Sequence, residues 1–420
     1  MNREYTVEIL GVGSELLLGN IVNTDARDIS VMLSEIGINV YWHSVVGDNP
    51  ARLTQAVEIA KNRADIIITT GGLGPTCDDL TKQVLARAFG LELEFNQEAA
   101  DRMRQHFAVL NRPMTDNNLQ QAYLPAGCTV FQNLWGTAPG CAFKAGESIV
   151  LMLPGPPREC NAMFRHCAMP YLRALSEDTI VSHNLRIFGM GESGVEYQLR
   201  DLMNELHNPT LAPYAKEGEC MLRVTAKAHT AAEAERLMQP VMERVRGILG
   251  DYIYGVDADS LEGAVLELLK ARGLTFAAAE SCTGGLVAKR ITDLPGASAV
   301  FPGGVNVYSD FAKAALLGID GELIAREGAV SEAVAREMAV KVRARLGADI
   351  GVGITGVAGP DTDGKHAVGE VYIALADEKG VFCRLYILGK TRERVRLAAA
   401  NNAFDLIRRR LCGLPLEPEI

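Results

Sequence analysis

Residues 65–76, DIIITTGGLGPT, place an uninterrupted apolar strand directly before a glycine-rich loop. An earlier apolar strand covers Val7 to Gly11, and Ile29, Met32, Leu33 and Ile36 repeat at helical spacing between the two strands. Strands that are apolar throughout and alternate with helices are typical of a parallel sheet covered on both faces. The stretch therefore predicts an α/β fold, with functional loops at the carboxyl ends of the strands.

The same pattern continues to a strand at 149–153 and then changes twice along the 420-residue chain. We predict three domains: a parallel-sheet domain over 1–170, a small α+β module over 171–255 and an α/β domain over 256–420. The middle module has no catalytic constellation, so we interpret it as a spacer or a dimerisation unit and expect a homodimer.

Composition narrows the class of protein. The chain has a net charge of −10, which argues against broad binding to nucleic acid or to an anionic membrane. No apolar run is long enough to span a bilayer, and the N-terminus carries charges where a signal peptide is apolar, so we expect a cytoplasmic protein. The nine cysteines form no CxxC pair and the seven histidines have no ligand spacing, so zinc is not indicated.

The C-terminal domain offers a serine nucleophile. Ser281 follows the apolar strand 274–279, and we expect a helix to begin directly after it. Backbone amides of Thr283 and Gly284 would then face the serine and could stabilise an oxyanion or hold a phosphate. The alternative is that Ser281 only caps the helix while the glycines pack against the sheet.

A serine nucleophile needs a base, and Lys313 is the candidate because a desolvated lysine can take the proton. Tyr308, at the end of the preceding strand, should lie at the same edge of the sheet. The alternative for Lys313 is a solvated surface side chain. Cys282 is a rival nucleophile, because a helix N-terminus would lower its thiol pKa.

Three segments carry a family resemblance: AESCTGG (279–285), FPGGVNVYSDFAK (301–313) and GVGITGVAGP (351–360). In this order they resemble the CinA C-terminal family, the nicotinamide mononucleotide deamidases. The resemblance implies hydrolysis to nicotinate mononucleotide and ammonia without a cofactor. It also implies that Ser281 is the nucleophile, Lys313 the base and Tyr308 a hydroxyl that positions the proton transfer. The implied substrate-binding residues are Thr283, Gly284, Thr355 and Gly356.

The loop after the strand at 65–70 contains Gly71, Gly72, Gly74 and Thr76 and continues into Asp78 and Asp79. Glycines allow a phosphate to approach the backbone closely, and acidic residues beside a phosphate suggest a bridging Mg²⁺ or similar cation. The alternative is that Asp79 or Thr81 caps the next helix. The loop lacks the Gly-Lys-Ser/Thr of a Walker sequence.

The N-terminal domain resembles the MoaB/MogA fold. The matching segments are GVGSELLLGNIVNTDA (11–26), VVGDN (45–49), TTGGLGPTCDDLT (69–81), GTAPG (136–140) and LPGPPRE (153–159). The resemblance implies that Asp48 and Asp79, with Asp78 as a further metal ligand, act on a nucleotide phosphate or its bound metal. The implied binding residues are Gly71, Gly72, Gly74 and Thr76.

Together the domains resemble the full-length CinA arrangement, whose middle module is KH-like. This arrangement implies a second activity, metal-dependent ADP-ribose pyrophosphatase, and a role in salvage of pyridine nucleotides and NAD metabolism. The middle module lacks a basic stripe, so RNA binding is not expected. Two alternatives stay open: a molybdopterin-binding N-terminal domain, and a regulatory partner in competence or the DNA-damage response.

Overall fold

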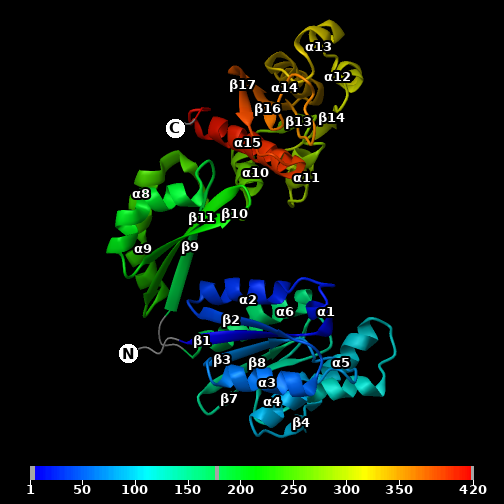
Figure 1. Cartoon of the computed structure of the whole chain (residues 1–420), viewed down its shortest axis with the longest axis vertical. Coiled ribbons are helices and arrows are strands. Elements are labelled where there is room, and N and C mark those ends of the chain that lie inside the picture. The colour runs from blue at the N-terminus through cyan, green and yellow to red at the C-terminus, as the bar shows by residue number, and fades with distance from the viewer. Residues whose placement is uncertain (1–4, 176–178, 418–420) are drawn as a thin grey trace. The chain divides into compact units, whose positions relative to one another are not determined.

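The computed structural model of the protein describes residues 5–175 and 179–417 (Figure 1). The charged N-terminal stretch that argues against a signal peptide therefore begins outside the described residues. The chain divides into two compact units, one of which runs to Ser182 and includes Thr225–Met238, and the other of which contains His183–Val224 and the chain from Gln239 onward. Among the described residues, no helix is both long and apolar enough to cross a membrane.

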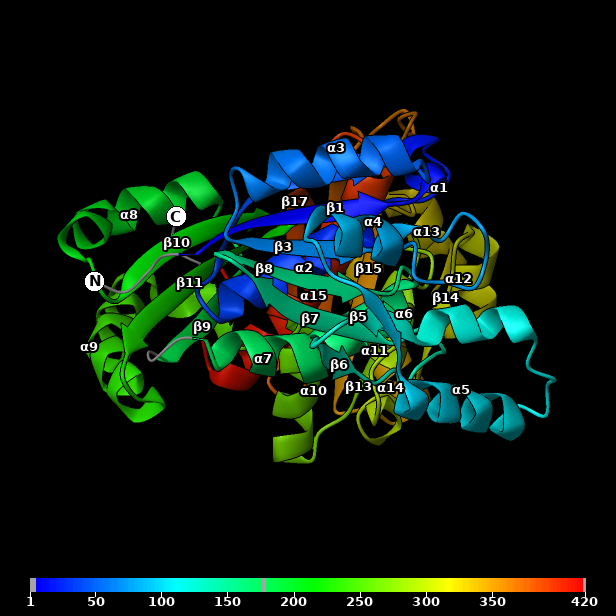
Figure 2. The same ribbon diagram turned by 90° about the horizontal axis from the view of Figure 1, so that it is seen from below.

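A six-stranded sheet in the order β2-β1-β3-β8-β7-β6 forms the centre of the N-terminal domain (Figures 1 and 2). Strands β1 (Thr6–Val12), β3 (Ile66–Thr70) and β8 (Ser148–Leu153) are parallel, as predicted. Strand β2 (Asn39–Val46) is also parallel to β1, but it was not predicted. Strands β7 (Gly140–Ala145) and β6 (Thr129–Phe131) extend the sheet in antiparallel pairs and were not predicted.

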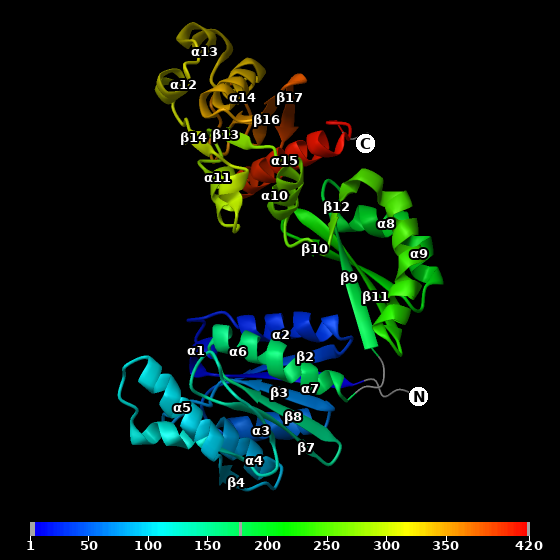
Figure 3. The same cartoon turned by 180° about the vertical axis from the view of Figure 1, so that it is seen from behind.

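Helices cover both faces of this sheet, which is why its central strands are apolar throughout. One face packs α2 (Thr24–Glu35), α6 (Pro157–Met163) and α7 (Met169–Arg173), and the other packs α3 (Pro50–Lys61) and α4 (Thr81–Ala88) (Figures 1 and 3). Ile9 and Leu10 of β1 lie in opposite cores. The domain also contains α1 (Ser14–Leu17), β4 (Leu93–Phe95), α5 (Gln97–Val109), the 3₁₀ helix η1 (Asp116–Ala122) and β5 (Tyr123–Pro125).

The middle module is built on a four-stranded sheet in the order β10-β11-β9-β12. Its elements are β9 (Thr179–Ile187), α8 (Glu192–Glu205), β10 (Thr210–Lys216), β11 (Glu219–Ala228), α9 (Ala231–Leu249) and β12 (Ile253–Val256). Thr230 caps the start of α9, because the Glu233 N–H donates to Thr230 Oγ1 at 3.2 Å.

The C-terminal sheet has the order β14-β13-β15-β16-β17. Strands β13 (Phe276–Glu280), β14 (Gly303–Asn306) and β15 (Ile350–Gly356) are parallel, whereas β16 (Glu370–Asp377) and β17 (Gly380–Ile387) are antiparallel. One face packs α10 (Leu261–Arg272), α11 (Leu286–Thr292) and α15 (Arg392–Cys412). The other packs α12 (Asp310–Leu317), α13 (Gly321–Glu327) and α14 (Glu332–Leu346) (Figure 3).

Two glycines allow α14 to lie close to the sheet. A Cβ atom at Gly351 of β15 would come within 2.1 Å of the Ala339 carbonyl oxygen. One at Gly353 would come within 2.3 Å of the Ala335 carbonyl oxygen. Both contacts are with helix backbone, which cannot move aside cheaply. This close packing holds β15 in the centre of the sheet, next to the strand that leads to Ser281.

Candidate active sites

Ser281 and Lys313 meet at the carboxyl edge of the C-terminal sheet. Ser281 directly follows β13 and is 6% exposed, and Lys313 lies on α12 and is 1% exposed. Lys313 Nζ lies 3.2 Å from Ser281 Oγ and donates to the Val307 carbonyl at 3.1 Å. Burial lowers the pKa of Lys313, although the negative charge of Asp310 opposes the shift. Lys313 is therefore not the solvated surface lysine of the alternative interpretation.

The helix expected directly after Ser281 begins later. Residues 281–285 form a turn, in which Gly284 and Gly285 have positive φ angles of 61° and 87°, and α11 begins at Leu286. The buried Glu280 carboxylate accepts the N–H groups of Val287 at 3.1 Å and Ala288 at 2.8 Å. The amides at the start of α11 are thus capped by Glu280 and do not face Ser281.

The prediction that the backbone amides of Thr283 and Gly284 face the serine needs a correction. The Gly284 N–H donates within the turn, to the Ser281 carbonyl at 3.0 Å. The Thr283 side chain is buried, and its carbonyl accepts two bonds from Arg396. Neither residue lines the pocket at Ser281. An oxyanion hole made by a helix N-terminus does not form here, because two left-handed glycines separate the serine from the helix.

The pocket at Ser281 has a volume of about 230 Å³, and Thr355 and Gly356 line it as the resemblance implies. Tyr308 is 63% exposed at its wall, and its hydroxyl accepts from Arg392 Nη2 at 3.0 Å. Arg392, the first residue of α15, also donates to the Gly359 carbonyl at 2.7 Å. Sequence reasoning missed Arg392, because nothing in its local context separates it from the other arginines of that helix.

Cys282 lines the same pocket but is a poor nucleophile. Its side chain is buried, and burial raises the pKa of its thiol to about 12. The expectation that a helix N-terminus would lower this pKa is wrong, because no helix begins at Cys282. The thiol therefore stays protonated at neutral pH, which leaves Ser281 as the better nucleophile.

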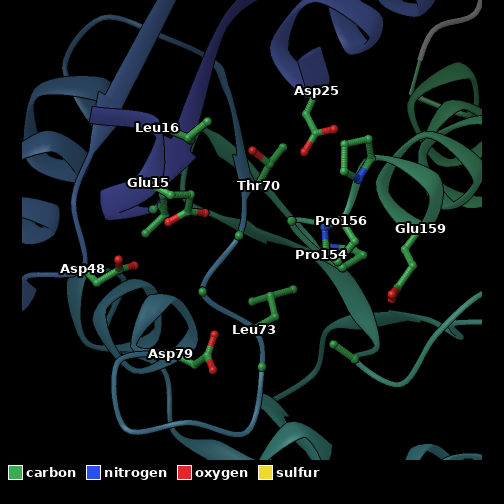
Figure 4. Close-up of a pocket in the computed structure, with 18 of the residues that line it drawn as sticks. Glu15, Leu16, Asp25, Asp48, Thr70, Leu73, Asp79, Pro154, Pro156 and Glu159 are labelled. Atoms are coloured by element: carbon green, nitrogen blue, oxygen red, sulfur yellow. The ribbon is translucent and has the colours of Figure 1, made fainter. Parts of the chain in front are cut away.

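A second pocket, of about 540 Å³, opens at the carboxyl ends of β1, β3 and β8 (Figure 4). Its wall includes Gly71, Gly72 and Gly74, as predicted, but not Thr76. Within the described ranges its lining contains no Lys, Arg or His. The lining carries six carboxyl groups, those of Glu15, Asp25, Asp48, Asp78, Asp79 and Glu159.

The loop aspartates stabilise the loop and not the helix that follows it. Asp79 Oδ2 accepts the Thr76 N–H at 2.8 Å. The Thr76 hydroxyl also lies within hydrogen-bond distance of the carboxylates of Asp78 and Asp79. Helix α4 begins at Thr81 with Leu80 at its N-cap and no side-chain cap. Thr81 Oγ1 instead donates to the Gly71 carbonyl at 2.9 Å. The helix-capping alternative for Asp79 and Thr81 is therefore wrong.

Asp48 and Asp79 each keep an oxygen available for a ligand. Asp48 Oδ2 accepts the Ser14 N–H at 2.8 Å, while Oδ1 of either residue accepts no hydrogen bond in residues 5–175 and 179–417. No group of three or more His, Cys, Asp or Glu in these ranges could hold a metal ion by itself. Mg²⁺ often takes only one or two carboxylates and completes its shell with substrate phosphates and water. Asp48 and Asp79 fit that kind of site.

Asp25 was not singled out from the sequence. It is 6% exposed, and its Oδ1 has no hydrogen-bond partner. Burial, and then the charge of Asp28, raise the pKa of Asp25 to about 6. Because the folded pKa exceeds the unfolded value, this carboxyl group stabilises the fold below about pH 4, and the stabilisation is lost as the pH rises through about 6.

Asp25→Asn is therefore expected to stabilise the N-terminal domain at pH 8 by roughly 1–3 kcal/mol and to have much less effect at about pH 4. Calorimetric unfolding at both pH values measures the difference. Asp101→Asn is the control, since Asp101 is exposed on α5 and its partners Gln97 and Arg104 lie on the surface of the same helix. A stability gain that does not depend on pH would contradict the assignment of this shift to Asp25.

Comparison with known proteins gives three adjoining family matches. The Probable molybdopterin binding domain matches residues 8–174, the Damage-inducible protein CinA KH domain matches 182–255 and the CinA C-terminal domain matches 258–411.

Full-length relatives match almost the whole chain. A CinA-like protein of Dictyoglomus thermophilum is 46% identical over 408 residues, which cover 97% of this chain and 99% of the relative. A putative competence-damage inducible protein of Acetivibrio thermocellus is 46% identical over 404 residues, 96% of this chain and 98% of the relative. The crystal structure of CinA from Thermoplasma acidophilum aligns with 40% of this chain and 98% of its own, at 32% identity and a TM-score of 0.37.

Proposed function

This chain belongs to the CinA family, with a MoaB/MogA-like domain, a KH module and a CinA C-terminal domain, and from that membership we propose that it is a bifunctional hydrolase of pyridine nucleotides. The C-terminal domain deamidates nicotinamide mononucleotide, and the N-terminal domain cleaves ADP-ribose to AMP and ribose 5-phosphate. Its partners in this proposal are these small nucleotides and a second copy of the chain.

The observation that carries the deamidase proposal is the 3.2 Å approach of Lys313 Nζ to Ser281 Oγ, with both side chains buried. A neutral Lys313 accepts the serine proton as Oγ bonds to the amide carbon. The C–N bond then breaks, and the lysine returns the proton to the departing ammonia. Water next hydrolyses the acyl-enzyme, which releases nicotinate mononucleotide and restores Ser281.

The other pocket residues suit an anionic nucleotide. Besides Lys313, the pocket lining presents the guanidinium of Arg392, which can attract the phosphate of a mononucleotide. Arg392 also donates to the Tyr308 hydroxyl, so the two side chains orient each other at the pocket wall. In this proposal Tyr308 positions the proton transfer. Thr355 and Gly356, at the end of β15, line another part of the same pocket.

The N-terminal proposal rests on a pocket that combines a glycine loop with six carboxyl groups and, in the described part of the chain, no basic side chain. Such a pocket repels a diphosphate unless a cation lies between them. Asp48 and Asp79 would hold the cation, with Asp78 as a further ligand, and the glycine loop would admit the phosphates. When bound, a divalent cation would neutralise part of the negative charge of the phosphates. Water attack at one phosphorus then breaks the bridging P–O bond.

Chelation should separate the two activities. EDTA is expected to abolish ADP-ribose cleavage and to leave deamidation essentially intact, because the serine site has its own base and needs no cation. Asp79→Asn should reproduce the effect of EDTA on ADP-ribose cleavage alone, since it weakens the cation site without altering residues 258–411. Product assays for AMP and for ammonia, each with and without chelator, measure both effects.

Asp101→Asn provides the matched control, because it removes an exposed carboxylate from the same domain outside the pocket. Circular dichroism checks that the Asp79 variant is folded. Equal loss of both reactions in EDTA, or normal ADP-ribose cleavage by Asp79→Asn, would show that the metal-bridged site is wrong.

One observation favours a second candidate for the N-terminal domain. The family model that matches residues 8–174 is described as a probable molybdopterin binding domain. On that alternative the acidic pocket binds a pterin phosphate without turnover of ADP-ribose. Binding of molybdopterin in the absence of AMP release would favour it. Absence of both AMP and ammonia release would favour a regulatory role, which the names of the relatives suggest.

A further inference from the structure

Two buried oxygen atoms in the acidic pocket have no hydrogen-bond donor. Asp25 and Gln121 are 6% and 2% exposed, both line the pocket, and Asp25 Oδ1 and Gln121 Oε1 are without a partner in the described part of the chain. Figure 4 shows the Asp25 carboxyl group directed into the hollow near Thr70. The two atoms are both acceptors, so the same kind of ligand group can satisfy both.

Neither oxygen is required by the fold around it. Asn23, not Asp25, caps α2, since the Asn23 side chain accepts the Ala26 N–H at 3.1 Å. At Gln121 it is the backbone carbonyl that takes part in the fold, by accepting from the buried Lys82 Nζ at 3.0 Å. The side-chain oxygens thus remain available for a ligand.

A buried acceptor without a donor costs folding free energy, because water no longer solvates it. A ligand that brings a donor to each oxygen would remove this cost only when it is bound. A diphosphate near neutral pH is an acceptor almost throughout and cannot supply such donors. The nucleoside part of a nucleotide can, through its ribose hydroxyls and the amino group of its base.

We propose that Asp25 and Gln121 accept hydrogen bonds from neutral O–H or N–H groups on the nucleoside part of the ligand, so that the pocket selects nucleotides over bare pyrophosphate. This inference rests on the proposed nucleotide pyrophosphatase function and adds a specificity subsite to it. Asp25 and Gln121 act in binding the nucleoside, whereas Asp48 and Asp79 would hold the cation that contacts the phosphates.

Titration calorimetry of the full chain with Mg²⁺ tests the proposal. We expect Asp25→Ala to weaken binding of AMP by about 10- to 100-fold, while binding of pyrophosphate stays the same or tightens because one negative charge is lost. The measurement belongs at pH 8, where Asp25 is ionised. Asp28→Asn is the matched control: it removes a carboxylate from the same helix, outside the pocket lining, and should change AMP binding less than threefold.

Ligand variants extend the test to the unaltered protein, so that a misfolded variant cannot obscure the answer. We expect 2′-deoxy-AMP or 3′-deoxy-AMP to bind at least tenfold more weakly than AMP if a ribose hydroxyl is the donor. Inosine monophosphate, which lacks the amino group of the base, should bind at least tenfold more weakly than AMP if that amino group is the donor. Equal affinity for all four nucleotides and for pyrophosphate, or wild-type AMP binding by Asp25→Ala, would overturn the proposal.

Failure of the nucleoside subsite can be distinguished from failure of the pyrophosphatase proposal. If the wild-type chain selects AMP over pyrophosphate through Asp25 but does not cleave ADP-ribose, the nucleoside subsite stands and the catalytic assignment is wrong. If it cleaves ADP-ribose but does not distinguish the deoxy and inosine nucleotides, the catalytic assignment stands and the subsite is wrong.

Discussion

Ser281→Ala is expected to lose at least on the order of 10³ in the rate of nicotinamide mononucleotide deamidation. The substitution removes the only atom that can form the acyl-enzyme in the proposed reaction, while Lys313 and the pocket remain. Since Ser281 is small and its Oγ contacts a side chain that also bonds the Val307 carbonyl, the fold should tolerate the change. Ammonia release from the purified full-length protein measures the rate.

Cys282→Ala is the matched control, one residue away in the same turn and the same pocket. Its thiol is buried and protonated, so most of the activity should remain. ADP-ribose cleavage should be unaffected in both variants, which checks each preparation. An inactive Cys282→Ala together with an active Ser281→Ala would make the protein a thiol enzyme.

Lys313→Arg is expected to be nearly inactive, with a loss of about 10²- to 10⁴-fold. An arginine keeps the positive charge but cannot deprotonate to accept the serine proton. Lys313→Met, which has a similar length and no charge, should be equally inactive and should fold, because it fills the same buried space without a buried charge. Lys341→Arg, on the exposed surface of α14, is the control.

The pH profile of the wild-type enzyme provides a second measurement. Burial lowers the pKa of Lys313, so the neutral base forms at a lower pH than the ~10.4 of a free lysine. Deamidation should therefore rise with pH and level off below that value. Substantial activity in Lys313→Arg, or a rate that falls as the pH rises through neutrality, would contradict the Ser-Lys mechanism.

Sequence patterns alone predicted the α/β class and the buried parallel strands β1, β3 and β8, but not β2. An apolar run such as Ile66–Ile68 is buried on both faces, and this requirement is local enough to be visible without any partner. Motif order also placed Ser281 and Lys313 in one domain. The antiparallel strands β6, β7 and β17 were missed. Strand β6 has three residues and β17 is half-exposed, so both have weak patterns, and β7 begins with the small residues Gly140, Cys141 and Ala142.

The chemistry of both pockets was decided by tertiary structure. The sequence left open whether Lys313 is a desolvated base or a solvated surface lysine. The packing of α12 buries the side chain, and that burial lowers its pKa. The contact between Arg392 and Tyr308 joins residues 84 positions apart, and the cap from Glu280 shows that Ser281 does not begin a helix. Likewise, Asp25 and Gln121 come from different elements and face one pocket. The sequence determines which groups exist and which strands are buried, but burial of a charge and convergence of distant side chains depend on how the elements pack.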